Sequence, residues 1–172
     1  MLIFFFFLLV CLFSILLYTV KVGISPVPSS FKAQKVIGQL LPENPSGKIY
    51  ELGAGWGTLL SLLAKKYPDC EIVGYELSPA PFVTSWLRCL GSRNAKVVWD
   101  DFFDADLKDA GLVVCYLYPG AMRKLKPKFE RELPKGAIVI SNTFAVPDWK
   151  AEQVIVLDDL YKTKVYLYRL PY

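Results

Sequence analysis

The stretch at 48–57, KIYELGAGWG, decides the fold. A short apolar strand runs into three glycines at alternate positions, and a helix begins at Thr58. Glycine lets the backbone turn tightly and approach a ligand, and open α/β sheets place their sites at the carboxyl ends of strands. The dinucleotide fingerprint G-x-G-x-x-G needs its third glycine at position 58, which is threonine here. The motif, with the acid Glu51 inside it, therefore suits a ligand that has a cationic centre and no phosphate.

Strand-like and helix-like segments alternate on both sides of this turn. The patterns predict helices over 31–41, 58–67, 81–90 and 121–133 and strands over 48–52, 71–77, 95–99, 111–118 and 137–142. Alternation of this kind predicts an α/β fold with a mostly parallel sheet and helices on both faces. The last two strands, 153–157 and 164–170, have no helix between them and form a C-terminal β-hairpin.

Composition excludes several classes of protein. Of the 172 residues 53% are hydrophobic, yet all 20 Lys and Arg and all 16 Asp and Glu lie beyond residue 20, which argues against disorder and a polytopic membrane protein. The net charge of +4 is modest, and the sequence has no dense basic stripe of the kind that nucleic-acid-binding proteins carry. Histidine is absent, which removes His-based metal sites and His-dependent triads. The four cysteines form no CxxC pair, so we expect no metal and a reducing compartment.

The first segment, MLIFFFFLLVCLFSILLYTV at 1–20, predicts a single transmembrane helix. The alternative is a cleaved signal peptide, but no basic residue precedes the apolar run and the residues around Val20 are a poor cleavage site. Lys21, Lys32 and Lys35 follow the span, so the positive-inside rule places the rest of the chain on the cytoplasmic side. Residues 21–30 then read as a linker and 31–172 as the domain.

Acidic residues follow the second and third predicted strands. Glu76 lies 19 residues after Gly57, where a carboxylate can accept hydrogen bonds from both hydroxyls of a ribose. The third strand ends in WDDFF at 99–103. An acid followed by an aromatic residue at that edge can bond an adenine amine and pack against its ring.

These motifs resemble those of the class I S-adenosylmethionine-dependent methyltransferases: ELGAGWG at 51–57, YELSP at 75–79 and DDFF at 100–103. LYPGAM at 117–122 and SNTF at 141–144 are similar to small membrane-anchored members, which include mitochondrial protein-lysine methyltransferases and bacterial relatives. The resemblance covers about 29–170 and implies a Rossmann-like, seven-stranded sheet, S-adenosylmethionine as cofactor and no metal. The connection 144–153 is too short for the helix that many members place there.

Carried over by position, the resemblance assigns a cofactor site. The methionine part would lie along Glu51, Gly53, Ala54, Gly55 and Gly57, the ribose at Glu76 with Leu77, and the adenine at Asp101 and Phe102, with Asp100 as the alternative acid. Methyl transfer is an in-line displacement, so such a site mainly positions the two partners and excludes water.

The acceptor side is less sharply marked. Tyr118 can steer a nucleophile through its hydroxyl, and Asn142 can position an amine; alternatively Tyr118 is a core aromatic and Asn142 a strand-end turn residue. We expect a protein lysine as acceptor, with a membrane lipid or quinone, or a non-catalytic scaffold, as alternatives. The basic helix 121–133 is either a solvated face or a surface for anionic headgroups, and Pro127 should kink or split it.

Overall fold

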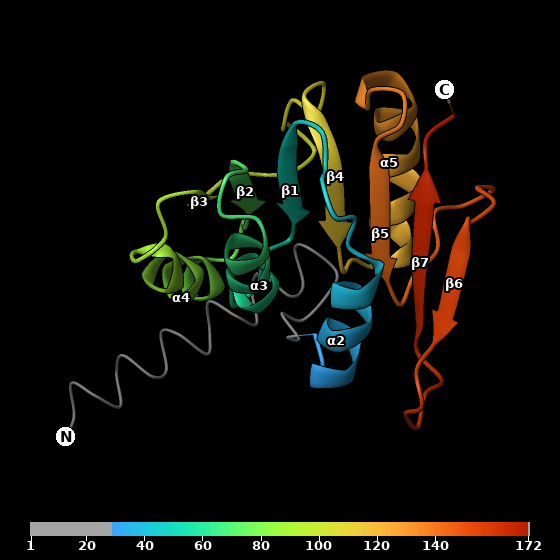
Figure 1. The fold of residues 1–172 in the computed structure, drawn as a ribbon, viewed down its shortest axis with the longest axis horizontal. Coiled ribbons are helices and arrows are strands. Elements are labelled where there is room, and N and C mark those ends of the chain that lie inside the picture. Colours follow the sequence, from blue (N-terminus) through green and yellow to red (C-terminus); the bar gives the residue numbers. More distant parts are fainter. Residues whose placement is uncertain (1–28, 172) are drawn as a thin grey trace.

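The computed structural model describes residues 29–171, which form a seven-stranded sheet flanked by helices (Figure 1). The elements in chain order are α2 (Phe31–Leu40), β1 (Lys48–Leu52), α3 (Thr58–Lys66), β2 (Ile72–Tyr75), α4 (Pro79–Cys89), β3 (Ala95–Val98), β4 (Ala110–Cys115), α5 (Pro119–Glu132), β5 (Ile138–Asn142), β6 (Gln153–Val156) and β7 (Lys164–Arg169). Every helix and strand predicted for this range is present, with ends that shift by a few residues.

The strands run in the order β3-β2-β1-β4-β5-β7-β6. The pairs from β3 to β5 are all parallel, whereas β7 is antiparallel to both β5 and β6. The predicted mostly parallel sheet with a C-terminal hairpin is therefore confirmed. The hairpin folds back so that its second strand, not its first, pairs with β5.

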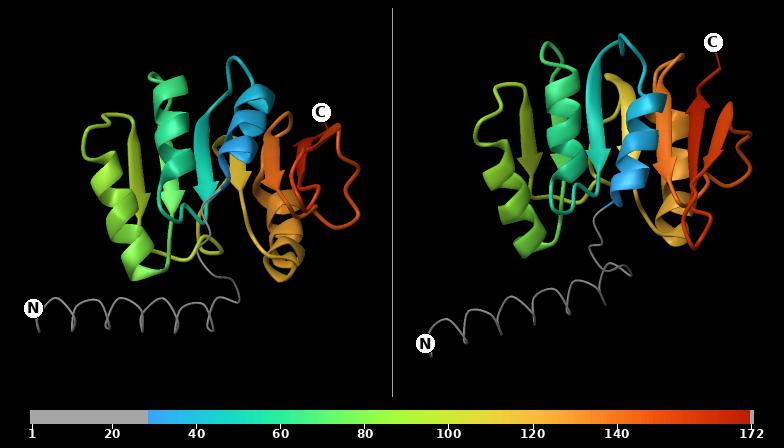
Figure 2. Two further views of the ribbon diagram at one scale, coloured as in Figure 1. Left: turned by 90° about the horizontal axis from the view of Figure 1, so that it is seen from below. Right: turned by 60° about the horizontal axis from the view of Figure 1, so that its bottom comes forward.

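Helices cover both faces of the sheet, but unequally. α2, α3 and α4 lie side by side on one face and α5 lies on the other (Figure 2). Neither 99–109 nor 143–152 contains a helix, so the short connection expected after β5 leaves α5 alone on its face. On that face the helix-free segment 99–109 contributes Phe102, Ala105 and Leu107 to the same core as α5, and Tyr50, Leu52 and Val73 of β1 and β2 are buried there.

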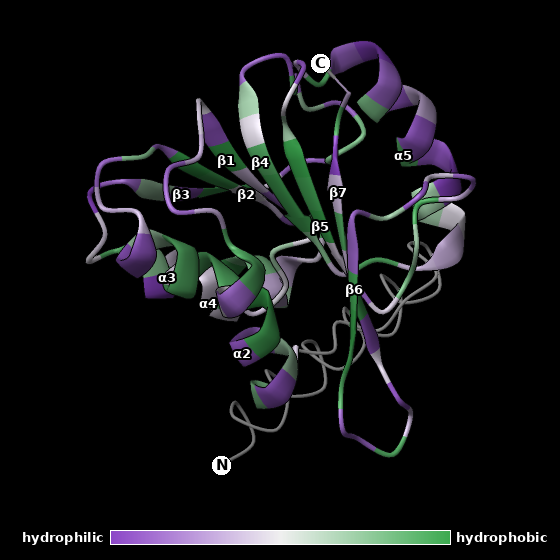
Figure 3. Ribbon diagram, turned by 45° about the vertical axis from the view of Figure 1, so that its right-hand side comes forward, coloured by the Kyte–Doolittle hydropathy of each residue, from purple (hydrophilic) through white to green (hydrophobic). Residues whose placement is uncertain are grey.

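Successive side chains along each strand point to opposite faces of the sheet, so the strands contribute to two apolar cores, one on each face. In β1, Ile49 belongs to the core that contains Ile37 of α2, and the next residue, Tyr50, belongs to the core that contains Phe129 of α5. β4 and β5 are buried at every residue, and hydrophobic colour runs along the centre of the sheet in Figure 3. Strands buried on both faces read as continuous apolar runs, which is why the sequence predicted them correctly.

Local signals explain where the helices begin. The Ser30 hydroxyl accepts a hydrogen bond from the Ala33 N–H at 3.2 Å and caps α2. α4 and α5 begin at Pro79 and Pro119, two residues before the predicted starts, because proline is favoured in the first turn. α5 continues past Pro127 to its end, so the proline does not split it.

The predicted transmembrane helix at 1–20, and most of the predicted linker, lie outside the described residues. Within 29–171, none of the helices combines the length and the apolar character needed to cross a membrane.

Candidate functional site

The predicted site residues gather at the carboxyl edge of the sheet. The glycine loop follows β1, Glu76 follows β2, the WDDFF segment follows β3, and Tyr118 comes shortly after β4 (Figure 1). Because these four strands are parallel, their carboxyl ends meet along one edge. This is the position where open α/β sheets bind ligands.

The glycine loop adopts a backbone shape that other residues resist. Gly53, Gly55 and Gly57 have φ angles of 78°, 54° and 77°, in the left-handed region. The N–H groups of Gly53 and Ala54 both donate to the Tyr75 carbonyl, at 3.0 and 2.8 Å. The loop is therefore tied to the end of β2 by its backbone.

The three glycines have different surroundings. A Cβ at Gly57 would lie 2.7 Å from the Ser85 Oγ and 2.9 Å from its Cα, so Gly57 permits close packing of α3 against α4. A Cβ at Gly53 would lie 2.8 Å from Leu117 Cδ2. At Gly55 the nearest atom is the Gly53 carbonyl oxygen at 4.0 Å, so this residue faces open space. Of the three, Gly55 is the one that leaves room for a ligand to approach the backbone.

Glu76 holds the glycine loop as well as facing it. Its Oε2 accepts from the Gly55 N–H at 2.8 Å, its Oε1 accepts from the Ser78 N–H at 2.7 Å, and 7% of the residue is exposed. A carboxylate has about four acceptor positions, so each oxygen can still accept one ribose hydroxyl. This structural role was missed from the sequence, because it depends on how close β1 and β2 bring two separate turns.

Glu51 is a buried acid without a counter-charge. Only 3% of it is exposed, and its Oε2 has no hydrogen-bond partner. Burial, and secondly the charge of Glu76, raise its pKa well above the ordinary value, although the Leu60 N–H at the start of α3 acts in the opposite direction.

Within 29–171, no Lys or Arg forms an ion pair with Glu51 or Glu76. An unpartnered buried carboxylate oxygen beside a second carboxylate is complementary to a cation, and S-adenosylmethionine carries a sulfonium and an ammonium. The residues present therefore fit this cofactor.

The acids after β3 are placed differently from the aromatic residue expected to act with them. Asp101 Oδ1 accepts from the Phe103 N–H at 3.0 Å, and Asp100 is exposed. Phe102 as a residue is 8% exposed, and it belongs to the core that contains the buried side of α5. The structure thus leaves the Phe102 backbone, not its ring, at the site.

The exposed aromatic surface at this corner belongs to Trp99, which sequence reasoning did not single out. Trp99 is 57% exposed, donates its indole N–H to the Leu77 carbonyl at 2.9 Å, and stacks on Phe82 with ring centroids 5.8 Å apart. The signal was present in the sequence, since Trp99 opens the same segment as the two acids.

Tyr118 and Asn142 lie at the same edge but on opposite faces of the sheet. Tyr118 precedes α5, and its half-buried ring covers Gly120, where a Cβ would lie 2.7 Å from its Cε2. Asn142 is 2% exposed and donates from Nδ2 to the Ser29 Oγ at 3.4 Å, on the α2 side. The structure therefore brings Asn142 to the segment before α2 and does not bring it to Tyr118.

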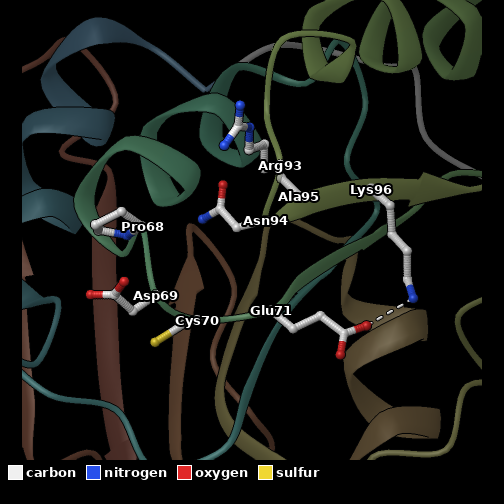
Figure 4. A pocket seen from close by; sticks show the side chains of 8 residues that line it. All are labelled: Pro68, Asp69, Cys70, Glu71, Arg93, Asn94, Ala95 and Lys96. Atoms are coloured by element: carbon white, nitrogen blue, oxygen red, sulfur yellow. Dashed lines mark hydrogen bonds and ion pairs between the residues drawn. The ribbon is translucent and has the colours of Figure 1, made fainter.

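The hollow in Figure 4 lies at the opposite edge of the sheet. It has a volume of about 380 Å³ and is lined by Pro68, Asp69, Cys70, Glu71, Arg93, Asn94, Ala95 and Lys96, near the amino ends of β2 and β3. An ion pair of 2.8 Å between Glu71 and Lys96 closes one side. No three His, Cys, Asp or Glu side chains come together as a metal site in the part of the chain that the structure describes.

Comparison with known proteins gives concordant results. Residues 51–153 match the model of the ANTKMT methyltransferase domain. The chain is 27% identical over 136 residues to a protein-lysine N-methyltransferase of Saccharolobus islandicus, covering 77% of this chain and 84% of that one. It is 31% identical over 118 residues to the adenine nucleotide translocase lysine N-methyltransferase of Mus musculus. That match covers 63% of this chain and 48% of the mouse protein, so the chain matches about half the length of the mouse relative.

Among solved structures, an RNA methyltransferase from Salinibacter ruber in complex with S-adenosyl-L-homocysteine has the same fold. The TM-score is 0.72 at 23% sequence identity, with 84% of this chain and 94% of that chain covered.

Proposed function

The chain belongs to the ANTKMT methyltransferase-domain family and is an S-adenosylmethionine-dependent methyltransferase, and we propose that it methylates a lysine side chain of a protein. We also propose that residues 1–20 tether it to a membrane. The observation that carries the proposal is the glycine loop between two carboxylates. Gly55 leaves an open approach to the backbone, and Glu51, which interacts electrostatically with Glu76, keeps an unpartnered buried oxygen.

The cofactor, when bound, supplies an electrophilic methyl group on a sulfonium. The chain's own residues bind and orient it. Glu51 balances positive charge near the loop, and Glu76 accepts the ribose hydroxyls with oxygens that the Gly55 and Ser78 N–H groups already orient. Asp101 retains Oδ2 for the adenine amine, since its Oδ1 is held by the Phe103 N–H. Orientation of this kind is the main contribution that an enzyme makes to a displacement reaction.

The acceptor amine must be neutral before it attacks. A lysine ammonium that enters a desolvated site has a lowered pKa, which favours loss of its proton. The Tyr118 hydroxyl stands where α5 begins, on the face of the sheet that α5 covers, and can accept a hydrogen bond from the incoming amine. Asn142 acts more indirectly, because its amide is held by Ser29.

Two observations support a protein as acceptor. The relatives with the matching domain are named for lysine methylation. In addition, the connections within 29–171 are short, and none is long enough to form a lid around a small molecule. A large acceptor can exclude water from the site with its own surface, which a small substrate cannot do.

The tether is supported by the sequence at 1–20, which is long and apolar enough to span a bilayer and contains no charge. Lys21, Lys32 and Lys35 follow it, which supports a cytoplasmic position for the domain.

The proposal is tested by mass spectrometry of membrane fractions from cells with the protein, without it, and with Gly55→Ala as a matched inactive control. We expect N-methyl-lysine peptides that appear only with the unaltered protein. Methylated lipids or quinones in the extract, with no change in lysine peptides, would replace the protein acceptor by a membrane-soluble one.

A further inference from the structure

The three helices on one face of the sheet contain no acidic residue. They carry five exposed basic side chains, Lys32, Lys35, Lys65, Lys66 and Arg88. We call the surface of α2, α3 and α4 the basic helical face. It belongs to one side of the molecule, because these helices lie next to one another over the sheet (Figure 2).

This face also exposes an apolar stripe on α4. Val83, Trp86, Leu87 and Leu90 follow the i, i+3, i+4, i+7 spacing of one helix side and are 50%, 48%, 55% and 63% exposed. The opposite side of the same helix is buried, at Pro81, Ser85 and Cys89. α4 therefore presents apolar side chains to solvent as well as to the core. Trp99 extends the exposed apolar surface at the carboxyl edge.

In the other candidate for a basic membrane surface, α5, three of the five basic side chains are paired with acids, and the ion pairs of the described residues leave out only Arg123 and Lys124 of this helix. Lys126 pairs with Asp148 at 3.1 Å, Lys128 with Glu132 at 2.7 Å and Arg131 with Glu132 at 2.6 Å. Charges that are already paired attract anionic lipid weakly. The helices of the basic helical face contain no acid, whereas α5 contains Glu130 and Glu132, so the basic helical face is the better match for an anionic surface.

We propose that the basic helical face lies on an anionic lipid bilayer, with the α4 stripe inserted at the headgroup boundary. Apolar and Trp side chains beside basic ones are the pattern of helices that lie in a membrane interface. This inference rests on the proposed tether. α2, the first described helix after the proposed tether, belongs to this face, and the ten residues 21–30 that separate the two can span at most about 35 Å at roughly 3.5 Å per residue. The domain is thus held close enough for its surface to touch the bilayer.

Such an orientation limits what the enzyme can reach. The carboxyl edge, with Glu76, would stand beside the bilayer, and Tyr118 on the α5 face would lie one sheet thickness above it, so acceptor lysines close to the headgroups would be preferred over lysines far above them. The structure therefore links the position of the acceptor to the face that carries α4.

Tryptophan fluorescence of the full chain tests this directly, because all four tryptophans, Trp56, Trp86, Trp99 and Trp149, lie outside 1–20. The chain is reconstituted into phosphatidylcholine–phosphatidylglycerol vesicles with brominated acyl chains, which quench only immersed indoles. We expect quenching that Trp86→Phe largely removes and that Trp149→Phe leaves in place, since Trp149 packs on Phe129 of α5.

A charge variant provides the second arm. Leu87→Glu should abolish the quenching while circular dichroism stays unchanged, because the side chain is exposed. Val156→Glu is the matched control: it is 52% exposed and lies in β6, the edge strand at the end of the sheet opposite β3. We expect Val156→Glu to leave the quenching intact.

Vesicle flotation shows whether the chain is bound to the membrane at all, and so distinguishes failure of the α4 docking proposal from failure of the tether proposal. A chain that floats with vesicles while Trp86 is unquenched keeps the tether and overturns the docking of α4. Trp86 emission that is shifted to the blue without quenching would show that a protein surface covers the stripe, which also overturns it. A chain that does not float overturns both.

Discussion

The Oε2 atom of Glu76 accepts a hydrogen bond from the N–H of Gly55 at 2.8 Å, so an acid at the end of β2 fixes the loop that follows β1. The same carboxylate accepts from the Ser78 N–H at 2.7 Å. One side chain therefore orders two turns and also faces the position of the cofactor ribose. Affinity and stability are coupled through this residue.

We predict that Glu76→Ala weakens binding of S-adenosylmethionine by about 10- to 150-fold, the loss of hydrogen bonds to a charged group. It should also lower the free energy of unfolding by about 1–3 kcal/mol, because two N–H groups at a largely buried position lose their acceptor. Calorimetric titration and denaturant unfolding measure the two effects. Glu76→Gln, which keeps one acceptor oxygen, should have an affinity and a stability between those of the unaltered protein and Glu76→Ala. Normal binding by Glu76→Ala would mean that the ribose lies elsewhere.

Glu51→Gln should make the cofactor-free protein more stable at neutral pH and weaken cofactor binding by about 10-fold or more. The pKa of Glu51 is raised in the folded state, so its contribution to stability is present below the ordinary value of 4.5 and is lost as pH rises towards the raised value. Thermal unfolding across pH 4–8 measures this effect. The fall in melting temperature that Glu51 causes as pH rises should be absent in Glu51→Gln. An unchanged pH profile would contradict the raised pKa.

Cofactor binding should release a proton from the fraction of Glu51 that is protonated, because a cation beside the carboxylate favours its ionised form. Titration calorimetry in two buffers with different ionisation enthalpies measures the released protons. Glu51→Gln is the control and should show none from this site. Equal proton release by both proteins would assign it to another group.

Gly55→Ala and Gly57→Ala should separate binding from stability. Both positions have positive φ, so alanine costs about 1–2 kcal/mol in either. At Gly57 the new Cβ also meets Ser85, and we expect a total loss of about 2–5 kcal/mol. At Gly55 the Cβ enters open space, so the fold survives and cofactor binding is lost. Melting temperatures and binding constants of both variants test this; equal stability loss in the two would contradict the packing role of Gly57.

Tyr118→Phe should lower kcat by about 10-fold or more without changing cofactor affinity, because it removes only the hydroxyl that orients the amine. Asn142→Ala provides the contrast. Its amide is buried against Ser29, so we expect it to destabilise the docking of the segment before α2. Kinetics with a lysine peptide and thermal unfolding distinguish the two. A kcat unchanged in Tyr118→Phe would make Tyr118 a packing residue.

Removal of residues 1–22 should yield a protein that no longer sediments with membranes but keeps its affinity for S-adenosylmethionine. The cap of α2 at Ser30 and both apolar cores lie beyond the cut. Flotation and calorimetry of the shortened and full chains provide the comparison. A shortened chain that fails to fold would make 1–20 part of the domain core.

The fold was predictable because its signals are local. The strand β4 is an unbroken apolar run, and α4 and α5 each begin at a proline that three residues separate from the end of a strand. The glycine loop was recognisable because each of its three glycines has a positive φ that other residues avoid. Patterns of this kind do not depend on distant parts of the chain.

The contacts that the sequence did not indicate all join segments that are distant in the chain. Asn142 meets Ser29 across 113 residues of sequence, and nothing near either residue indicates the other. Phe102 was expected at the adenine, but its ring is buried in the α5 core. Gly57, predicted to line the cofactor, also packs against Ser85 of the next helix, and the sequence did not indicate that contact. Side-chain direction after a strand end follows from packing, which sequence spacing does not specify.

The position of β7 between β5 and β6 has a consequence for the time course of folding. β6 is synthesised before β7, yet it has no partner until β7 exists, because β7 alone links it to the sheet. During translation the outer edge of β5 therefore stays unpaired while residues 143–163 emerge. Unpaired strand edges invite association with other chains. A ribosome that pauses before residue 164 would thus hold a nascent chain with an open, apolar sheet edge, a state in which a chaperone is most needed.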